Sequence, residues 1–232
     1  YLEKSKFFIS GASTFSKLNH FGKGKTPFAV VKGDGAYVWD VDGNQYIDYV
    51  SSRGYNILGF NNKYVNDAIK YQLDKGINFS LPHKLEIEVA EMLCNHFPSA
   101  EMVRFGKNGN DVTAAAIRLA RHYTKKDHIL FCGYHGWQDW YIVKTSMSGG
   151  IPKVIGDYTH SFVYNDVDSL EKLFKVNENN VAAVIMEPTR FIEPSCYGEE
   201  KCMRQECKVS CQKNFLHAVD EITKKNNAIL IF

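Results

Sequence analysis

The chain has 232 residues, of which 44% are hydrophobic and 23% charged, a balance typical of a globular protein with a sizeable core. The 28 basic and 26 acidic residues give a formal net charge of +2, which argues against a nucleic-acid or anionic-membrane partner. No apolar run approaches the roughly 20 residues that cross a bilayer. The chain begins without Met and without a signal-peptide pattern, so we expect a trimmed N-terminus and a cytoplasmic protein with mostly reduced cysteines.

The first 60 residues predict an arm followed by a small antiparallel sheet. Residues 1–27 are polar and contain several glycines, which indicates an arm with one short helix. Runs of β-branched and aromatic residues then follow at 28–32, 36–40 and 45–50. Because Asp-Gly turns separate these runs, we expect three strands joined by tight turns.

The remainder, residues 61–232, predicts one α/β domain. Apolar residues at helical spacing predict helices over 62–75, 84–97, 112–123 and 215–225. Short apolar runs predict strands over 102–105, 128–132, 181–186 and 228–232. Helices alternating with all-apolar strands favour a mainly parallel sheet. Because the last run has the composition of a core strand, we interpret the chain as a piece of a longer protein.

The turn Asn108-Gly109-Asn110 is the first candidate binding element. We expect it to follow a strand and to open a helix, where free backbone N–H groups and a partial positive charge favour an anion. Gly109 lets a ligand approach the backbone closely, and Asn110 is a residue type that caps helices. The turn therefore suits a phosphate group. The alternative is a capped helix after a tight turn, with no ligand.

Two further candidates lie where strands are expected to end, which is where α/β sheets bind ligands. The first is the loop Gly133-Tyr134-His135-Gly136-Trp137, in which a tyrosine between glycines can lie flat against a planar ring. The second is Glu187, whose carboxylate is costly to bury unless it is paired. The alternatives are an aromatic loop that only packs and an exposed strand terminus.

These segments, taken in order, resemble one family. Residues 35–48, 101–121, 133–137 and 184–188 are similar to the class III aminotransferases, and most similar to those of the glutamate-1-semialdehyde aminomutase type. The resemblance covers nearly all of residues 16–232 except about 190–212. Several motifs in the right order are far more specific than any one of them.

The resemblance implies a pyridoxal-phosphate enzyme of fold type I, with a mainly parallel large domain and a small domain that includes residues 1–60. It implies a homodimer with shared active sites and small-molecule substrates, an amino donor and a carbonyl acceptor. The following roles are implied for residues of this chain: Asn108, Gly109 and Asn110 at the cofactor phosphate, Tyr134 stacked on the ring with His135 beside it, Glu187 in the polar network near the ring, and Ser52 and Arg53 at the substrate. For Arg53 the alternative is an ordinary surface arginine.

Two departures from the family matter for the expected activity. The family usually has a hydroxyl residue at position 110, and often at 108, whereas this chain has asparagine at both. The family's Schiff-base lysine and its aspartate at the pyridine nitrogen are expected beyond Phe232, so no catalytic residue is assigned. We expect the full-length protein to be an aminotransferase, and we expect the 232-residue piece to be inactive on its own. The alternatives are an intramolecular aminomutase and a non-catalytic, cofactor-binding relative.

A cysteine cluster has no counterpart in the family. Cys196, Cys202, Cys207 and Cys211 lie within sixteen residues, but no Cys-x-x-Cys pair occurs among them. Metal binding, a disulfide and free thiols in a surface insertion all remain open.

Overall fold

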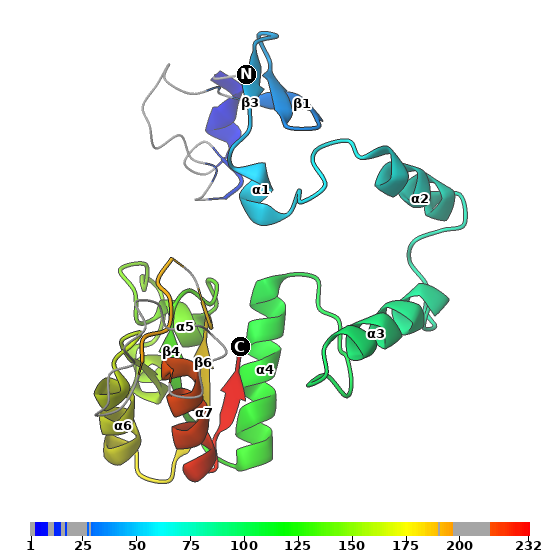
Figure 1. Ribbon diagram of the computed structural model, residues 1–232. Helices are drawn as coiled ribbons and strands as arrows, with labels where there is room; N and C mark the ends of the chain where they lie inside the picture. Colours follow the sequence, from blue (N-terminus) through cyan, green and yellow to red (C-terminus); the bar gives the residue numbers. More distant parts are fainter. Residues whose placement is uncertain are drawn as a thin grey trace. The chain divides into compact units, whose positions relative to one another are not determined.

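The computed structural model describes residues 3–8, 12–14, 17, 27, 29–189, 191–196 and 214–232. The chain divides into two compact units, Tyr1–Met92 and Leu93–Phe232 (Figure 1). The domain boundary expected near residue 60 stays a prediction. Among the described residues, no helix has both the length and the apolar character needed to cross a membrane.

The first unit contains the predicted meander. A short 3-10 helix, η1 (Glu3–Phe7), precedes a sheet in which β2 (Tyr37–Asp40) pairs antiparallel with β1 (Val30–Asp34) and with β3 (Gln45–Ile47). The carboxylate of Asp40 organises the β2–β3 turn. It accepts the backbone N–H groups of Asp42 and Asn44 at 3.0 and 2.8 Å, the Asn44 amide at 3.0 Å and the Tyr46 hydroxyl at 2.9 Å. These bonds, chiefly that from the Asn44 side chain, lower the pKa of Asp40.

A strained turn follows the meander. The short element α1 (Ser51–Gly54) has left-handed backbone angles at Ser51, Ser52 and Arg53, with φ of 45°, 50° and 61°. Consecutive left-handed conformations in residues other than glycine are unfavourable and are found most often at functional sites. The predicted substrate residues Ser52 and Arg53 lie in this turn.

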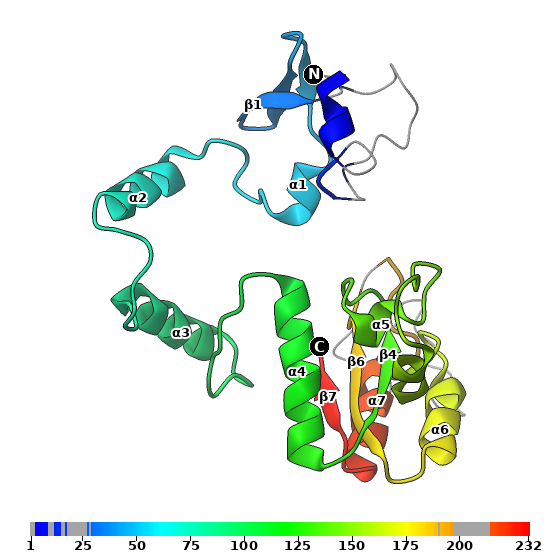
Figure 2. The ribbon, with the colours of Figure 1, turned by 180° about the vertical axis from the view of Figure 1, so that it is seen from behind.

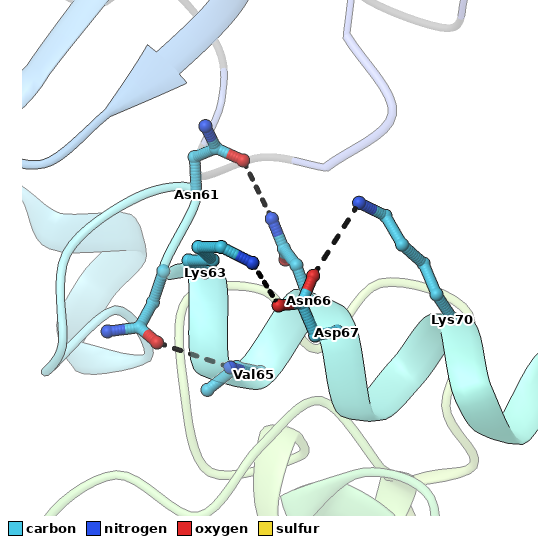
Figure 3. Close-up of polar contacts among 7 residues, drawn as sticks. Asn61, Lys63, Val65, Asn66, Asp67 and Lys70 are labelled. Atoms are coloured by element: carbon cyan, nitrogen blue, oxygen red, sulfur yellow. Dashed lines mark hydrogen bonds and ion pairs between the residues drawn. The ribbon is translucent and has the colours of Figure 1, made fainter.

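The two helices predicted next are confirmed as α2 (Lys63–Leu73) and α3 (Lys84–His96). The side chain of Asn62 caps α2 by accepting the N–H of Val65 at 3.2 Å. On the next turn Asp67 pairs with Lys63 and, at 4.0 Å, with Lys70 (Figure 3). Such exposed pairs stabilise a helix only modestly.

The second unit is built on a four-stranded, all-parallel sheet of order β5-β4-β6-β7. The strands are β4 (His128–Cys132), β5 (Thr159–Ser161), β6 (Val181–Met186) and β7 (Ile229–Ile231). All six residues of the central strand β6 are buried, whereas the three residues of β7 are only partly buried. The difference follows from position, because β7 forms an edge of the described sheet.

Helices cover both faces of this sheet. Helices α4 (Gly109–Thr124) and α5 (Asp139–Ile142) pack on one face, and α6 (Val167–Val176) and α7 (Phe215–Lys225) pack on the other (Figures 1 and 2). The 3-10 helix η4 (Lys153–Tyr158) leads into β5. Along β4, Ile129 and Phe131 face the α4 side while Leu130 faces the α6 side. The predicted parallel α/β layer is therefore confirmed.

Three local predictions are wrong. Residues 102–105 form no strand, because a strand exists only through hydrogen bonds to a neighbour and no described strand pairs with them. The following helix begins at Gly109 rather than at residue 112. Its N-cap is Asn108 rather than Asn110, because the Asp111 carboxylate folds back onto the Asn108 backbone N–H at 3.2 Å.

Candidate functional site

The predicted site residues of the second unit come from the ends of two neighbouring strands and from the start of α4. Cys132, the last residue of β4, lies opposite Met186, the last residue of β6. The loop over residues 133–138 and the side chain of Glu187 therefore begin side by side. Parallel strands bring their carboxyl ends to the same edge of the sheet, where α/β proteins bind ligands.

Glu187 is held directly against the 133–138 loop. Its Oε2 atom accepts the backbone N–H of Tyr134 at 3.3 Å. Gly133 has a φ of +96°, and a Cβ at this position would lie 2.6 Å from the same Oε2 atom. The backbone angle therefore favours glycine at position 133, and an added Cβ would displace the Glu187 carboxylate from its place.

The start of α4 presents two unused hydrogen-bond donors. The N–H groups of Asp111 and Val112 donate to the Asn108 carbonyl at 3.0 and 3.3 Å. Within the described part of the chain, no acceptor faces the N–H groups of Gly109 and Asn110. A Cβ at Gly109 would meet no neighbouring atom within 4 Å. The positive end of a 16-residue helix thus presents free donors next to open space.

Tyr134 is exposed and supported from one side. Its side chain is 59% exposed, and its ring meets the ring of Tyr141 edge-on, with centroids 5.7 Å apart. Tyr141 is buried on α5, and its hydroxyl donates to the Gly133 carbonyl at 3.1 Å. An aromatic ring held in this way can receive another planar ring.

His135, in contrast, is a core residue of the loop. It is 6% exposed, and its Nε2 atom donates to the Cys132 carbonyl at 3.0 Å. Its ring stacks on Trp140 at 6.0 Å and meets Phe131 edge-on. Burial lowers the pKa of His135, against the opposing effects of the Cys132 bond and the Glu187 charge. Its predicted position beside a cofactor ring stays a prediction.

Two side chains of α4 bind the 133–138 loop. Asn110 Oδ1 accepts the N–H groups of Trp137 at 3.0 Å and Gln138 at 3.4 Å. Thr113 Oγ1 lies 3.1 Å from both the Asn110 and the His135 carbonyl oxygens, and its single proton is donated to one of them or shared between the two. Sequence reasoning did not identify Thr113, because a hydroxyl residue in the first turns of a helix is common and carries no signal of a distant partner.

A small cavity of about 260 Å³ opens beside Glu187. It is lined by Cys132, Gly133, Tyr164, Glu187, Phe191 and Ile192. Burial, together with the nearby Glu187 carboxylate, raises the pKa of the Cys132 thiol. A larger hollow of about 770 Å³ is lined by Arg121 and Tyr158 and also by Trp137 of the candidate loop, but by none of the residues predicted to contact cofactor or substrate.

The structure does not test the remaining predicted residues. Ser52 and Arg53 belong to the first compact unit, so their role at a substrate stays a prediction. Of the cysteine cluster, Cys202, Cys207 and Cys211 lie outside the described residues. Among the residues that are described, no group of three or more His, Cys, Asp or Glu side chains could hold a metal ion.

A parallel sheet with a glycine-opened helix and an aromatic loop at its strand ends defines a ligand-binding α/β protein. Residues 20–232 match the family model described as aminotransferase class-III. The chain belongs to this family, and the predicted resemblance is confirmed.

Similar proteins include glutamate-1-semialdehyde 2,1-aminomutases. The chain is 36% identical to that of Wigglesworthia glossinidia brevipalpis over 244 residues, which cover all of this chain and 53% of the relative. It is 38% identical to that of Chlorobaculum tepidum, covering 99% of this chain and 53% of the relative. The chain therefore spans about half the length of the relatives it matches.

Solved structures agree on the fold. An omega-transaminase from Sphaerobacter thermophilus superposes with a TM-score of 0.82 at 28% identity, covering 100% of this chain and 53% of that one. A glutamate-1-semialdehyde aminomutase from Pseudomonas aeruginosa gives a TM-score of 0.77 at 23% identity, covering 99% and 49%. The second likeness concerns the fold alone. The predicted fold type I is confirmed.

Proposed function

We propose that this chain is the cofactor-binding part of a pyridoxal-phosphate-dependent aminotransferase, which transfers an amino group from an amino donor to a carbonyl acceptor. The observation that carries the proposal is the pair of free N–H groups at Gly109 and Asn110, next to open space and fastened to the Tyr134 loop. When bound, the cofactor supplies an aldehyde that takes up amino groups and a ring that delocalises electrons.

The residues present fit a phosphorylated pyridine. The two N–H groups at the start of α4 suit the phosphate, which is favoured at a helix N-terminus. The exposed ring of Tyr134 offers a surface for the pyridine ring. Glu187, held by the Tyr134 N–H, places a carboxylate at the edge of the same site. Burial lowers the pKa of His135, which disfavours a positive charge on the loop.

A second candidate is an intramolecular aminomutase, in which the amino group leaves and re-enters the same molecule. The names of the relatives at 36% and 38% identity favour it. The two candidates differ in substrate requirement. An aminotransferase needs separate donor and acceptor, whereas an aminomutase converts a single amino-aldehyde. Following product formation by the full-length protein, with each substrate offered singly and in pairs, separates the two.

We also propose a cytoplasmic homodimer with shared active sites, acting on small molecules, without a nucleic-acid or membrane partner. Family membership supports the dimer, and the formal net charge of +2 supports the absence of a polyanionic partner. Light scattering of the full-length protein would give twice the chain mass if the proposal is correct, and a single chain mass would refute the dimer.

The cofactor proposal is tested by removing one N–H donor. Gly109→Pro deletes the donor at the first helical position, where proline is well tolerated, and Asn108 before it is already extended. Gly109→Ala keeps the donor and is the matched control. Because charge-assisted bonds contribute about 1.5–3 kcal/mol, we expect Gly109→Pro to weaken pyridoxal phosphate binding by roughly 10- to 100-fold.

Pyridoxal, which lacks the phosphate, serves as the second ligand in the same titrations. Its weaker binding should be equal in Gly109→Pro and the wild type. If the proline variant binds pyridoxal phosphate as tightly as the alanine variant, the phosphate does not lie at the start of α4. If the full-length wild type binds neither ligand, the cofactor proposal itself is wrong.

A further inference from the structure

We propose that the side chain of Asn110 is a positioning residue rather than a phosphate ligand. Its carboxamide oxygen would lock the 133–138 loop to the start of α4 before any cofactor binds. This inference rests on the proposed function, because it concerns the geometry between the phosphate-binding N–H groups and the ring surface of Tyr134. It also assigns a role to an asparagine where the family usually has a hydroxyl residue.

The contacts of the carboxamide point toward the loop. Asn110 Oδ1 accepts two consecutive backbone N–H groups, those of Trp137 at 3.0 Å and Gln138 at 3.4 Å. A single oxygen that accepts two N–H groups has used both of its lone pairs. The backbone N–H of Asn110, in contrast, keeps no described acceptor. The residue thus faces the loop with its side chain and the proposed phosphate position with its backbone.

Gly136 makes room for this contact. It has a φ of +107°, and a Cβ built on it would lie 2.0 Å from Asn110 Oδ1 and 2.9 Å from Asn110 Cγ. No side chain larger than hydrogen fits at position 136 while the carboxamide stays in place. The position of the Asn110 carboxamide therefore depends on glycine at position 136, because any side chain there would occupy the same space.

A hydroxyl residue would not make the same link. In serine or threonine the oxygen is bonded to Cβ, whereas Oδ1 of asparagine lies one bond further from the backbone. The loop N–H groups are thus within reach of asparagine or aspartate at position 110 but not of the shorter side chain. Thr113 adds a second link, because its hydroxyl lies 3.1 Å from the His135 carbonyl oxygen and can donate to it.

The consequence for binding follows from the rigidity of the cofactor. Its phosphate and its ring belong to one small molecule, so the two protein elements that receive them must hold a defined separation. A loop that is already fixed lowers the entropic cost of binding. Loss of the Asn110 link should therefore weaken binding of the ring as well as of the phosphate, which a phosphate ligand alone would not do.

The test compares Asn110→Ala with Asn110→Asp, which keeps an oxygen at the same reach. In the cofactor-free, full-length protein, we expect hydrogen exchange at the Trp137 and Gln138 amides to become roughly tenfold faster in Asn110→Ala, for a lost bond of about 1.4 kcal/mol. Exchange should be unchanged in Asn110→Asp. Pyridoxal binding should weaken several-fold in the alanine variant and recover in the aspartate variant.

Gly136→Ala supplies an independent perturbation, because it expels the carboxamide while leaving Asn110 intact. It should speed exchange at the same two amides, and the double variant with Asn110→Ala should show little further change, as expected for coupled residues. Unchanged exchange in both single variants would overturn the proposal. So would a loss of pyridoxal phosphate binding with unaltered pyridoxal binding in Asn110→Ala, since that pattern belongs to a phosphate ligand.

The failure of this inference is distinguishable from that of the proposed function. If the wild-type protein binds neither pyridoxal nor its phosphate, the cofactor proposal fails. The exchange rates of the Trp137 and Gln138 amides in the cofactor-free protein still decide whether Asn110 fixes the loop.

Discussion

Replacing Gly133 by alanine tests how tightly Glu187 is held against the end of β4. Gly133 has a φ of +96°, and an added Cβ would lie 2.6 Å from Glu187 Oε2 and 3.3 Å from Glu187 Cδ. A left-handed backbone costs a residue other than glycine about 1–2 kcal/mol, and displacing the Glu187 carboxylate from its bond to the Tyr134 N–H costs about 0.5–1.5 kcal/mol. Lower entropy of the unfolded chain offsets about 0.4–1 kcal/mol. We expect a net destabilisation of about 2 kcal/mol.

Two nearby glycines separate these contributions. Gly150 has a φ of +84°, but its Cβ would meet nothing within 4 Å, so Gly150→Ala carries the backbone strain alone. The Cβ of Gly149 would also meet nothing, and its backbone is outside the left-handed region. We therefore expect a loss of about 1 kcal/mol for Gly150→Ala. For Gly149→Ala we expect a change of less than about 0.5 kcal/mol.

The assay is urea unfolding of the purified protein followed by tryptophan fluorescence. Trp140 is buried on α5 and reports on the Leu93–Phe232 unit. The urea concentration at the midpoint of unfolding should be highest for Gly149→Ala, lower for Gly150→Ala and lowest for Gly133→Ala. The slope of the unfolding free energy against urea concentration should be the same in all three. If Gly133→Ala is no less stable than Gly150→Ala, the carboxylate of Glu187 does not press on the loop and the reasoning is refuted.

Three further substitutions test the core and the buried side chains of His135 and Asp40. Leu170→Ala should lower the free energy of unfolding by about 2–5 kcal/mol, because its side chain is 0% exposed, while Leu119→Ala at 68% exposure should change it little. His135→Gln should flatten the pH dependence of stability. Because burial lowers the pKa of His135, its stabilising effect is complete above about pH 6.5 and is lost as the pH falls; an unaltered profile in urea unfolding would contradict this. Asp40→Asn should likewise make the stability of the meander less sensitive to acid. Because the pKa of Asp40 is lowered, its ionised carboxylate stabilises the fold above the ordinary carboxyl pKa of about 3.9. This stabilisation is lost as the pH falls below that value, and Trp39 fluorescence in an acid titration would measure the loss.

Buried segments with a strong local pattern were predicted from the sequence with correct bounds. The all-apolar run Val181–Met186 is the central strand β6, and the amphipathic run Phe215–Lys225 is helix α7. In both cases the spacing of apolar residues along the chain decides the outcome, because each segment buries its own hydrophobic face against adjacent layers. The family, too, was identified from motifs in their order along the chain and then confirmed by the matching family model.

Predictions failed or were silent where the outcome depends on residues distant in sequence. Residues 102–105 have the composition of a strand, yet they form none because a strand needs a partner. Asn110 was predicted from the sequence as the residue that caps α4. The folded Asp111 carboxylate selects Asn108, and the N–H of Trp137, 27 residues away, engages the Asn110 side chain.

The sequence by itself determined apolar segments such as β6 and α7, the order of the motifs and therefore the family. Only the tertiary structure decided what the individual polar groups do. It buries His135 in the aromatic core of its loop and turns Asn110 Oδ1 toward that loop. The physical reason is that apolar periodicity acts along one segment, whereas a polar atom's role depends on which donor or acceptor the parallel sheet brings beside it.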